Sequence, residues 1–442
     1  MVARQEKAPN AQETFAQMAQ ASGLRGRILL TIGMLILVRL GIFLPIPGIN
    51  RESFSAFINQ QNNAILGFLD IFSGGGLTAL GIFALGILPF INASIILQLL
   101  TAAIPSLENL QKNEGEAGRR KISQITRYVA VGWAIVQSTG IALWVRPYAE
   151  TPGIPFVVET VIALTAGSMF VMWVGELITE RGIGNGASLL IFVSIVSSLP
   201  KSLGQTIDLA QVSAEKGNQA IVIGVVVLLL SFLAMIVGIV FVQEAIRRIP
   251  IVSARRQVGR RMYLERSSYL PLRLNQGNVM PIIFASAVLI LPASLSQFTR
   301  NEFLVRAANY LSPAGPTPYI YVAFYLLLIL FFSYFYASLV VNPVDMAQNL
   351  KKMGASIPGI RPGKATTEYL ERVLNRLTFL GAIFLGIVAI VPTAVESATR
   401  VTTFQRGLGA TSLLILVGVA IETAKQVQTY VISQRYEGMV KQ

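Results

Sequence analysis

The side chains that could do chemistry in this chain are few, and their types exclude most enzymatic reactions. The 442 residues include no Cys and no His, which removes thiolate nucleophiles, disulfides, His-ligated metals and His-dependent triads. Asp occurs only at positions 70, 208 and 345, and none of these is central in an apolar run. Paired carboxylates for proteolysis inside a membrane are therefore missing. We expect no enzyme, no metal site and no cofactor.

Three glycine-rich runs could bind phosphates by type, but their sequence context argues against it. They are residues 74–76, 182–186 (GIGNG) and 407–409 (GLG). A phosphate loop needs Lys followed by Ser or Thr, and a dinucleotide fingerprint needs a strand before the glycines and a helix after them. Since no run meets either requirement, we expect no ATPase activity in this chain.

The first glycine run precedes the polar side chains with the clearest candidate role. Residues 74–76 interrupt a long apolar run, and Asn92, Ser94 and Gln98 follow at intramembrane depth. Glycine is unfavourable in a helix interior, and irregular backbone in hydrocarbon must be shielded by protein or face water. The pattern indicates an aqueous path. A single transmembrane helix, kinked at Pro89 and starting in a Gly-rich loop, explains this stretch about equally well.

Two basic loops supply a second set of candidate binding residues. Residues 244–273 contain eight Arg, no Lys and two Glu, while residues 342–376 contain six Lys and Arg against three acidic residues. Guanidinium groups bind phosphates and carboxylates in bidentate fashion, so we interpret the first loop as a folded hairpin that docks a macromolecule. For the second loop, positive charge that sets the membrane topology and attracts anionic lipid is a good explanation by itself. Arg361 lies there between two Pro-Gly turns, which predicts a fixed tip.

The elements that must position these residues are membrane helices. The chain is 53% hydrophobic and 13% charged, which excludes a soluble multidomain protein. At about 20 residues per crossing, the apolar runs predict an all-α polytopic membrane protein with ten transmembrane helices. The predicted spans are residues 28–44, 79–103, 128–145, 156–178, 185–200, 219–242, 278–298, 318–341, 377–394 and 410–431.

The distribution of positive charge predicts the topology. An N-terminus in the cytoplasm places 27 of the 36 Lys and Arg residues on the cytoplasmic side, so both termini are predicted to be cytoplasmic. Five spans on each side of an external loop give two halves of inverted orientation. The predicted order is a tail at 1–27, an N-terminal half at 28–200, an external hinge loop at 201–218, a C-terminal half at 219–431 with cytoplasmic loops 244–273 and 342–376, and a tail at 432–442.

Several segments, in chain order, resemble the SecY family of channel subunits in bacterial and plastid protein translocases. They are RLGIFLPIPGIN (39–50), FSGGGLTALGIFALGILPFINASIILQLL (72–100), EGEAGRRKISQITRY (114–128), GELITERGIGNGASLLIF (175–192), the Arg-rich stretch 247–274, NPVDMAQNLKKMGASIPGIRPG (342–363) and TSLLI (411–415). The resemblance implies a protein-conducting channel with a central pore between the halves. Such a channel passes unfolded secretory chains across the membrane and releases signal and transmembrane helices sideways into the bilayer.

The resemblance also implies roles for particular residues. It implies a plug at residues 64–78 with Asp70, Phe72, Ser73, Gly74, Gly75 and Gly76, a pore ring of Ile87, Ile91, Ile191, Ile283 and Ile415, a lateral gate with Asn92, Ser94 and Gln98, and docking of a motor or ribosome at Arg260, Arg261, Arg273 and Arg361. A ring of branched aliphatic side chains leaves no stable place for water or ions when closed. Without the family pattern, lipid contact or core packing explains any single isoleucine better.

The expected partners follow from the same resemblance. They are the small membrane subunits SecE and SecG, the motor ATPase SecA, the ribosome through its RNA phosphates, precursors that bear signal peptides, and anionic lipids. The tail is most similar to cyanobacterial or plastid relatives, so the plasma (inner) membrane or the thylakoid membrane is expected. Sequence leaves open which arginines meet the ribosome and which meet the motor.

Two other functions compete with a protein channel. A secondary transporter of a small solute also uses broken helices and inverted halves. It requires a polar or charged pocket near the midplane that is coupled to ions, which this sequence lacks, and it leaves the basic loops unexplained. A structural scaffold would need neither the glycine break nor the polar side chains after it.

Overall fold

The computed structural model describes residues 22–49, 54, 73–113, 115–253, 257–258, 261–262, 267–286, 288–289, 302–303, 306, 310–311, 318–399 and 410–440. The chain divides into two compact units. The first unit comprises residues 1–204 with 419–442, and the second comprises residues 205–418. Both boundaries fall inside helices, namely α9 (Gly186–Glu215) and α16 (Ala410–Val440).

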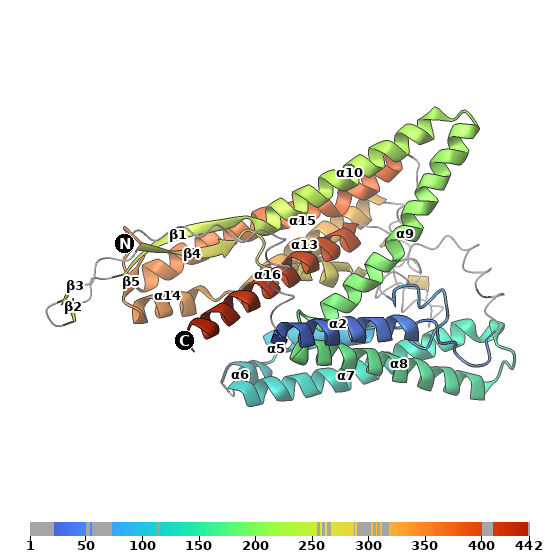
Figure 1. Cartoon of the computed structure of the whole chain (residues 1–442), viewed down its shortest axis with the longest axis horizontal. Coiled ribbons are helices and arrows are strands. Elements are labelled where there is room, and N and C mark those ends of the chain that lie inside the picture. Colours follow the sequence, from blue (N-terminus) through green and yellow to red (C-terminus); the bar gives the residue numbers. More distant parts are fainter. Residues whose placement is uncertain are drawn as a thin grey trace. The chain divides into compact units, whose positions relative to one another are not determined.

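The first unit is built on two long helices, α7 (Gly115–Val145) and α8 (Ile154–Arg181), which lie side by side (Figure 1). Helices α5 (Leu88–Ala103) and α6 (Pro105–Asn113) pack on α7, and α2 (Ser22–Gly41) packs on α8. A short 3-10 helix, η1 (Arg146–Tyr148), follows α7. Along one face of α7, a small buried residue recurs at every fourth position, which allows neighbouring helices to approach closely. These residues are Thr126, Ala130, Ala134, Ser138 and Ala142.

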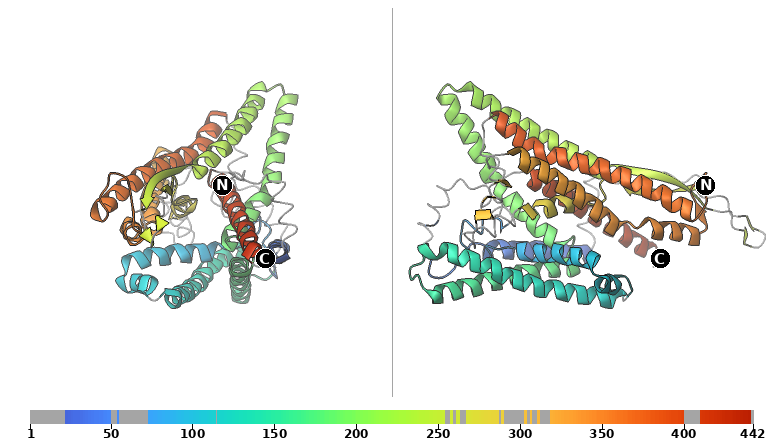
Figure 2. Two further views of the ribbon diagram at one scale, coloured as in Figure 1. Left: turned by 60° about the vertical axis from the view of Figure 1, so that its left-hand side comes forward. Right: turned by 180° about the vertical axis from the view of Figure 1, so that it is seen from behind.

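The helices of the second unit pack on α15 (Lys364–Thr399), which lies against both α10 (Gln219–Glu244) and α13 (Pro318–Val340) (Figure 2). A short amphipathic helix, α14 (Pro343–Lys352), packs on α15 as well. The side chain of Asn342 caps α14 by accepting a hydrogen bond from the backbone N–H of Val344 at 3.0 Å.

A small sheet lies beyond the helices of the second unit, so the all-α prediction is wrong for this part of the chain. Strand β1 (Ile246–Ser253) lies between β4 (Ser267–Arg273) and β5 (Ala355–Ser356), all antiparallel. Strands β2 (Gln257–Val258) and β3 (Arg261–Met262) pair separately. The hairpin predicted in residues 244–273 is confirmed.

The two basic loops share one hydrophobic core, which the sequence did not predict. Ile249, Ile251 and Leu272 of the sheet pack with Leu350 of α14 and Leu370 of α15, together with further buried residues. Strand β5 comes from residues 342–376, whereas β1 and β4 come from residues 244–273. We call β1, β4, β5, α14 and the first turns of α15 the sheet module.

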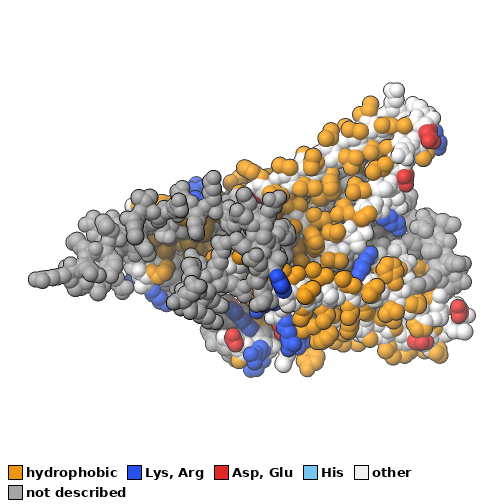
Figure 3. Space-filling view, in the orientation of Figure 1, with side chains coloured by type: hydrophobic (Ala, Val, Ile, Leu, Met, Phe, Trp, Pro, Cys, Tyr) orange, Lys and Arg blue, Asp and Glu red, His pale blue; other side chains and the backbone are white. Residues whose placement is uncertain are grey.

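Within the residues that the structure describes, six helices are long and apolar enough to cross a membrane, which supports the prediction of a multi-span membrane protein. They are Gly115–Tyr148, Ile154–Arg181, Gly186–Glu215, Gln219–Glu244, Tyr319–Lys352 and Lys364–Pro392. On the face shown in Figure 3, hydrophobic side chains cover the long helices and charged side chains gather near helix ends. The predicted span 278–298 lies largely outside the described residues, which are helical at 280–286 and 288–289. The total of ten spans therefore stays a prediction.

The predicted external loop at 201–218 is mostly helix, which corrects the sequence analysis. Helix α9 continues through Pro200 to Glu215, and residues 216–218 alone connect it to α10. Proline removes one backbone hydrogen bond from a helix interior, but packing outweighs this loss here. Ser202, Thr206 and Ser213 are buried after the proline, on spacings that fit one helical face.

Candidate functional site

The segment from Ser73 to Ile87 is irregular backbone among membrane helices. Residues 74–87 form turns, and α5 begins only at Leu88, nine residues later than the predicted span 79–103. Pro89 lies in the first turn of α5, where it is compatible with a helix, so a single proline-kinked helix is excluded. The glycine break predicted from sequence is confirmed, and it is longer than predicted.

The backbone of this segment adopts left-handed conformations at four places. Gly74, Gly75 and Gly86 have φ values of 67°, 88° and 53°, and Leu80 has a φ of 44°. Glycine adopts this region without strain, whereas a leucine does so at a cost. Leu80 is completely enclosed with Phe54 and Val145, which holds it in place. The positive φ values at Gly74, Gly75 and Gly86 explain why glycine stands at these three positions.

Neighbouring elements satisfy backbone carbonyl and N–H groups that the missing helix leaves unpaired. The guanidinium of Arg39 on α2 donates to the carbonyl of Gly74, and Ser168 Oγ on α8 donates to the carbonyl of Gly86 at 3.0 Å. The Ile46 N–H donates to the carbonyl of Leu80 at 3.1 Å, and the Ile82 N–H donates to the carbonyl of Leu44 at 2.9 Å. Such pairing is what irregular backbone requires at membrane depth.

Two glycines let this backbone approach its neighbours. A Cβ atom at Gly81 would collide with the carbonyl oxygen of Ile42, and one at Gly167 on α8 would collide with the carbonyl oxygen of Ile82. Because these obstacles are backbone atoms, they cannot move aside as a side chain can. Segment 73–87 is therefore fitted closely between α2 and α8.

Arg39 ties α2 to the irregular segment. An arginine near the end of an apolar run can extend its charged group to water. In the structure Arg39 is instead half-buried and donates to Gly74, and its guanidinium also lies 5.9 Å from the ring of Phe43. The carbonyl of the irregular segment therefore holds this side chain among the helices.

The plug residues lie only partly within the described chain. Asp70 and Phe72, with residues 64–69 and 71, lie outside it. Ser73 is buried, and its Oγ accepts a hydrogen bond from the Leu77 N–H at 3.1 Å. A Cβ at Gly74 would lie 2.7 Å from Arg39 Nη1 and 3.0 Å from Ser194 Oγ. The end of the predicted plug is thus enclosed by α2 and α9.

The five predicted pore isoleucines divide between the two units. Ile87, Ile91 and Ile191 belong to the first unit, and Ile283 and Ile415 belong to the second. The Ile91 N–H donates to the Ile87 carbonyl at 3.1 Å, so these two are one turn apart. Ile87, Ile191, Ile283 and Ile415 are buried, and Ile91 is half-buried.

The three predicted gate residues lie together on α5. Asn92, Ser94 and Gln98 are half-buried, whereas the intervening Ala93 and Leu97 are buried. Gln98 Nε2 donates to Ser94 Oγ at 3.2 Å, one turn earlier on the same helix. Their contact is thus local, which leaves the role in a gate as a prediction.

Three of the four predicted docking arginines, Arg261, Arg273 and Arg361, lie within the described residues. Arg273 at the end of β4 and Arg361 before α15 are exposed. Arg261 lies in β3, opposite Val258, and Arg260 lies outside the described residues. Sequence reasoning did not single out Arg248, whose guanidinium lies 4.9 Å above the ring of Tyr269 on the exposed face of the sheet. The alternating apolar residues of β1 could have indicated that face.

A cluster of three hydroxyl groups in the second unit was also missed. Ser286 Oγ lies 3.2 Å from Tyr325 Oη, and Tyr325 Oη lies 3.3 Å from Thr411 Oγ1. The three residues come from different helical segments, separated by 39 and 86 positions in sequence. No local pattern could have revealed their contact.

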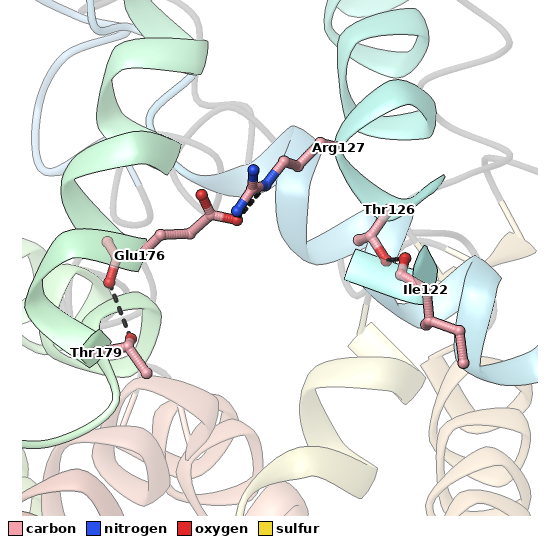
Figure 4. A network of polar contacts seen from close by, with 6 residues as sticks. Ile122, Thr126, Arg127, Glu176 and Thr179 are labelled. Carbon is pink, nitrogen blue, oxygen red and sulfur yellow. Dashed lines mark hydrogen bonds and ion pairs between the residues drawn. The ribbon is translucent and has the colours of Figure 1, made fainter. Parts of the chain in front are cut away.

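A further polar contact joins α7 to α8. Arg127 Nε donates to Glu176 Oε1 at 2.8 Å (Figure 4). One turn further along α8, Thr179 Oγ1 accepts a hydrogen bond from the Gly186 N–H at 2.9 Å. These contacts fix the turn at 182–186, the second glycine run, as a connection between helices.

Comparisons with known proteins agree with this arrangement. The SecY family model matches residues 81–424. The "Protein translocase subunit SecY" of Synechococcus elongatus is 72% identical over 443 residues, with 100% of both chains covered. "The structure of a protein conducting channel" is 19% identical and covers 91% of both chains, with a TM-score of 0.63. "Sec61 in the Canine ribosome-channel complex from the endoplasmic reticulum" is 17% identical, also covers 91% of both chains, and has a TM-score of 0.60. At these identities the two structures show a shared fold.

Proposed function

The chain belongs to the SecY family, and we propose that it is the channel subunit of a protein translocase. It conducts unfolded secretory chains across the membrane and releases signal and transmembrane helices laterally into the bilayer. The observation that carries this proposal is the full-length identity of 72% to a translocase subunit. The irregular segment 73–87, enclosed by membrane helices, is the structural feature that supports it.

The proposed architecture has ten transmembrane helices in two inverted halves around a central pore. The N-terminal half spans residues 28–200 and the C-terminal half spans residues 219–431, with a plug at 64–78. Six spanning helices and the helix α5 fit this scheme. Both termini, the tails at 1–27 and 432–442, and the sheet module lie in the cytoplasm, in keeping with the concentration of Lys and Arg in those stretches.

We place the pore ring at Ile87, Ile91, Ile191, Ile283 and Ile415. Branched aliphatic side chains around a narrow waist exclude water and ions without binding a passing polypeptide specifically. Ile87 and Ile91 are one turn apart, as a two-residue contribution from one helix requires. Asn92, Ser94 and Gln98 follow on the same helix and line the lateral gate, where weak polar contacts permit opening.

The sheet module docks the energy-supplying partner. Its exposed Arg273 and Arg361, with Arg260 and Arg261, meet carboxylates of the motor SecA or phosphates of ribosomal RNA. A shared core fixes the two basic loops relative to each other, so one partner contacts both. The small subunits SecE and SecG and anionic lipids complete the assembly, in the plasma membrane or the thylakoid membrane.

Arg361→Glu tests the docking assignment. We expect motor-driven export to fall roughly tenfold, because repulsion replaces a charge-assisted contact. The residue is exposed and outside the shared core, so the amount of assembled protein should not change. Lys201→Glu, at an exposed position of α9, is the matched control and should export normally. Equal export by the two variants would show that Arg361 is not part of the docking surface.

Reconstitution tests the function itself. Proteoliposomes containing this chain, its small partner and the motor should protect a signal-bearing precursor from added protease, in an ATP-dependent manner. Vesicles without the chain, and a precursor without its signal peptide, are the controls. Uptake of a small solute without precursor transport would contradict the proposal and favour a secondary transporter.

A further inference from the structure

Two helical segments in the second unit each carry a proposed pore isoleucine and a hydroxyl one turn away. Ile283 and Ser286 lie three residues apart in the helical residues 280–286, and Thr411 and Ile415 lie four residues apart on α16. At these spacings the members of each pair lie on one helix face. A contact that fixes either hydroxyl therefore also fixes the isoleucine on the same helix face.

A single side chain from a third helix joins the two segments. The hydroxyl of Tyr325 on α13 lies 3.2 Å from Ser286 Oγ and 3.3 Å from Thr411 Oγ1. Tyr325 and Ser286 are buried, so the hydroxyls have little water to bind instead. A hydroxyl both donates and accepts, which lets Tyr325 serve both neighbours at once.

A close contact on the other side of the isoleucines joins the same two segments. Gly418 on α16 lies against Val279, and a Cβ at Gly418 would collide with a methyl group of Val279. Val279 precedes Ile283 by one turn, and Gly418 follows Ile415 by about one turn. The turn that carries Ile283 and Ile415 is thus bracketed by the hydroxyl cluster and by this glycine contact.

Aromatic packing supports the cluster from α13. The ring of Phe284 lies edge-on to Phe332, with 5.6 Å between centroids, and Tyr321 stacks on Tyr325 at 5.7 Å. These rings fix the direction in which the Tyr325 hydroxyl points. The arrangement is more than a pair of polar groups that happen to meet.

We propose that Tyr325 is a positioning residue that holds Ile283 and Ile415 together as one half of the pore ring. The inference rests on the proposed function, since it takes both isoleucines as ring members. The hydroxyl cluster fixes the spacing of the two helical segments, so that the pair moves together when the channel opens. Loss of the hydroxyl lets the two isoleucines separate in the resting state, and small ions pass.

The experiment compares ion conductance of the resting channel for Tyr325→Phe and Tyr334→Phe in planar bilayers. Tyr334 is a matched control on the same helix, because its hydroxyl also bonds to another helix, at 3.4 Å from the Asn375 carbonyl, and makes no contact with the hydroxyls of the cluster. We expect resting conductance to rise roughly eightfold in Tyr325→Phe, because two weak interhelical contacts are lost and each contributes a factor of roughly three. Tyr334→Phe should match the unaltered chain.

Two more variants keep the test decisive if Tyr325→Phe assembles poorly. Ser286→Ala and Thr411→Val each remove one contact of the cluster, and each should raise resting conductance. If the cluster acts as a unit, neither should raise it further when combined with Tyr325→Phe. Equal conductance in all cluster variants and the control would overturn the inference, as would effects of the two changes that simply add.

Precursor transport by the unaltered chain separates failure of the inference from failure of the proposed function. Transport in the same vesicles together with unchanged conductance in the variants would reject only the role of Tyr325. Absence of transport by the unaltered chain would reject the function and the pore ring, and the inference with them.

Discussion

Segment 73–87 and the hydroxyl cluster around Tyr325 are held in place by different means. The segment forms turns instead of a continuous helix, and bonds with α2, α8 and residues 44–46 satisfy several of its backbone carbonyl and N–H groups. The helical segments around Tyr325 keep their own backbone bonds, and side-chain hydroxyls, ring packing and the contact of Gly418 with Val279 join them. One region is fixed through its backbone, and the other through side chains.

The difference indicates which region tolerates change. A side chain added to segment 73–87 meets backbone atoms of another element, and a lost partner leaves a carbonyl unpaired in a dry environment. A side chain removed from the hydroxyl cluster leaves helices that still satisfy themselves. We expect large effects in the first region and graded effects in the second.

The largest effect should come from Gly81→Val. The new side chain would collide with the Ile42 carbonyl, and overpacking against backbone costs about 3 kcal/mol of folding free energy. Thermal unfolding in detergent should show a strong loss of stability, or no assembled protein. Gly33→Val, on α2 with open space around its Cβ position, is the control and should lose little. Similar unfolding temperatures for the two would show that segment 73–87 is not closely fitted.

Arg39→Leu should have the next largest effect. The change removes the donor to the Gly74 carbonyl, and an unsatisfied buried acceptor costs about 1–3 kcal/mol. Because this cost falls on the closed position of the proposed plug, resting ion conductance should rise by roughly tenfold or more. Arg146→Leu, at an exposed position after α7, is the control. Conductance that remains at the control value would mean that Arg39 does not hold the plug.

Gly418→Ala should give an intermediate effect in the second region. Alanine favours the helix by up to about 1 kcal/mol over glycine, but its methyl group would collide with Val279. We expect a net loss of about 1 kcal/mol, because side chains can partly yield. Gly238→Ala on α10, whose nearest neighbour is a ring atom of Phe384 at 3.9 Å, should be neutral or stabilising. Val279→Ala should rescue Gly418→Ala, and a failure of rescue would contradict the contact.

The smallest effect should come from Glu176→Gln. Its bond to Arg127 is partly exposed, and such pairs contribute about 0.5 kcal/mol. Unfolding at low salt should show this loss, and about 1 M salt should reduce it. Glu116→Gln, which removes the partner of an exposed pair at 4.0 Å, should have no effect. A loss as large as that of Gly418→Ala would show that the contact between α7 and α8 is stronger than its exposure indicates.

The helical character, the multi-span class and the glycine break could be predicted from the sequence, because hydropathy and glycine content report them directly. The start of α5 could not. Residues 77–87 are as apolar as a membrane helix, and their turns are stabilised by Arg39 and Ser168 from other helices. The composition of residues 77–87 does not reveal these partner side chains.

The same reason explains the other differences. The predicted span 185–200 ends at Pro200, but α9 continues past this proline with buried residues. Strand β5 has two residues and pairs with a strand about a hundred positions earlier. The hydroxyls of Ser286, Tyr325 and Thr411 meet only in the fold. The pore ring came from the family pattern, since isoleucine is common in every span.

The shared core of the sheet module has a consequence for the construction of chimeric channels. Ile249 and Ile251 come from one basic loop, and Leu350 and Leu370 come from the other. If one loop alone were replaced by that of a distant relative, its apolar side chains would not fit those of the other loop. The apolar side chains of both loops would then be exposed to water. The two loops must therefore be exchanged together, even though 68 residues lie between the end of β4 and Asn342, which caps α14.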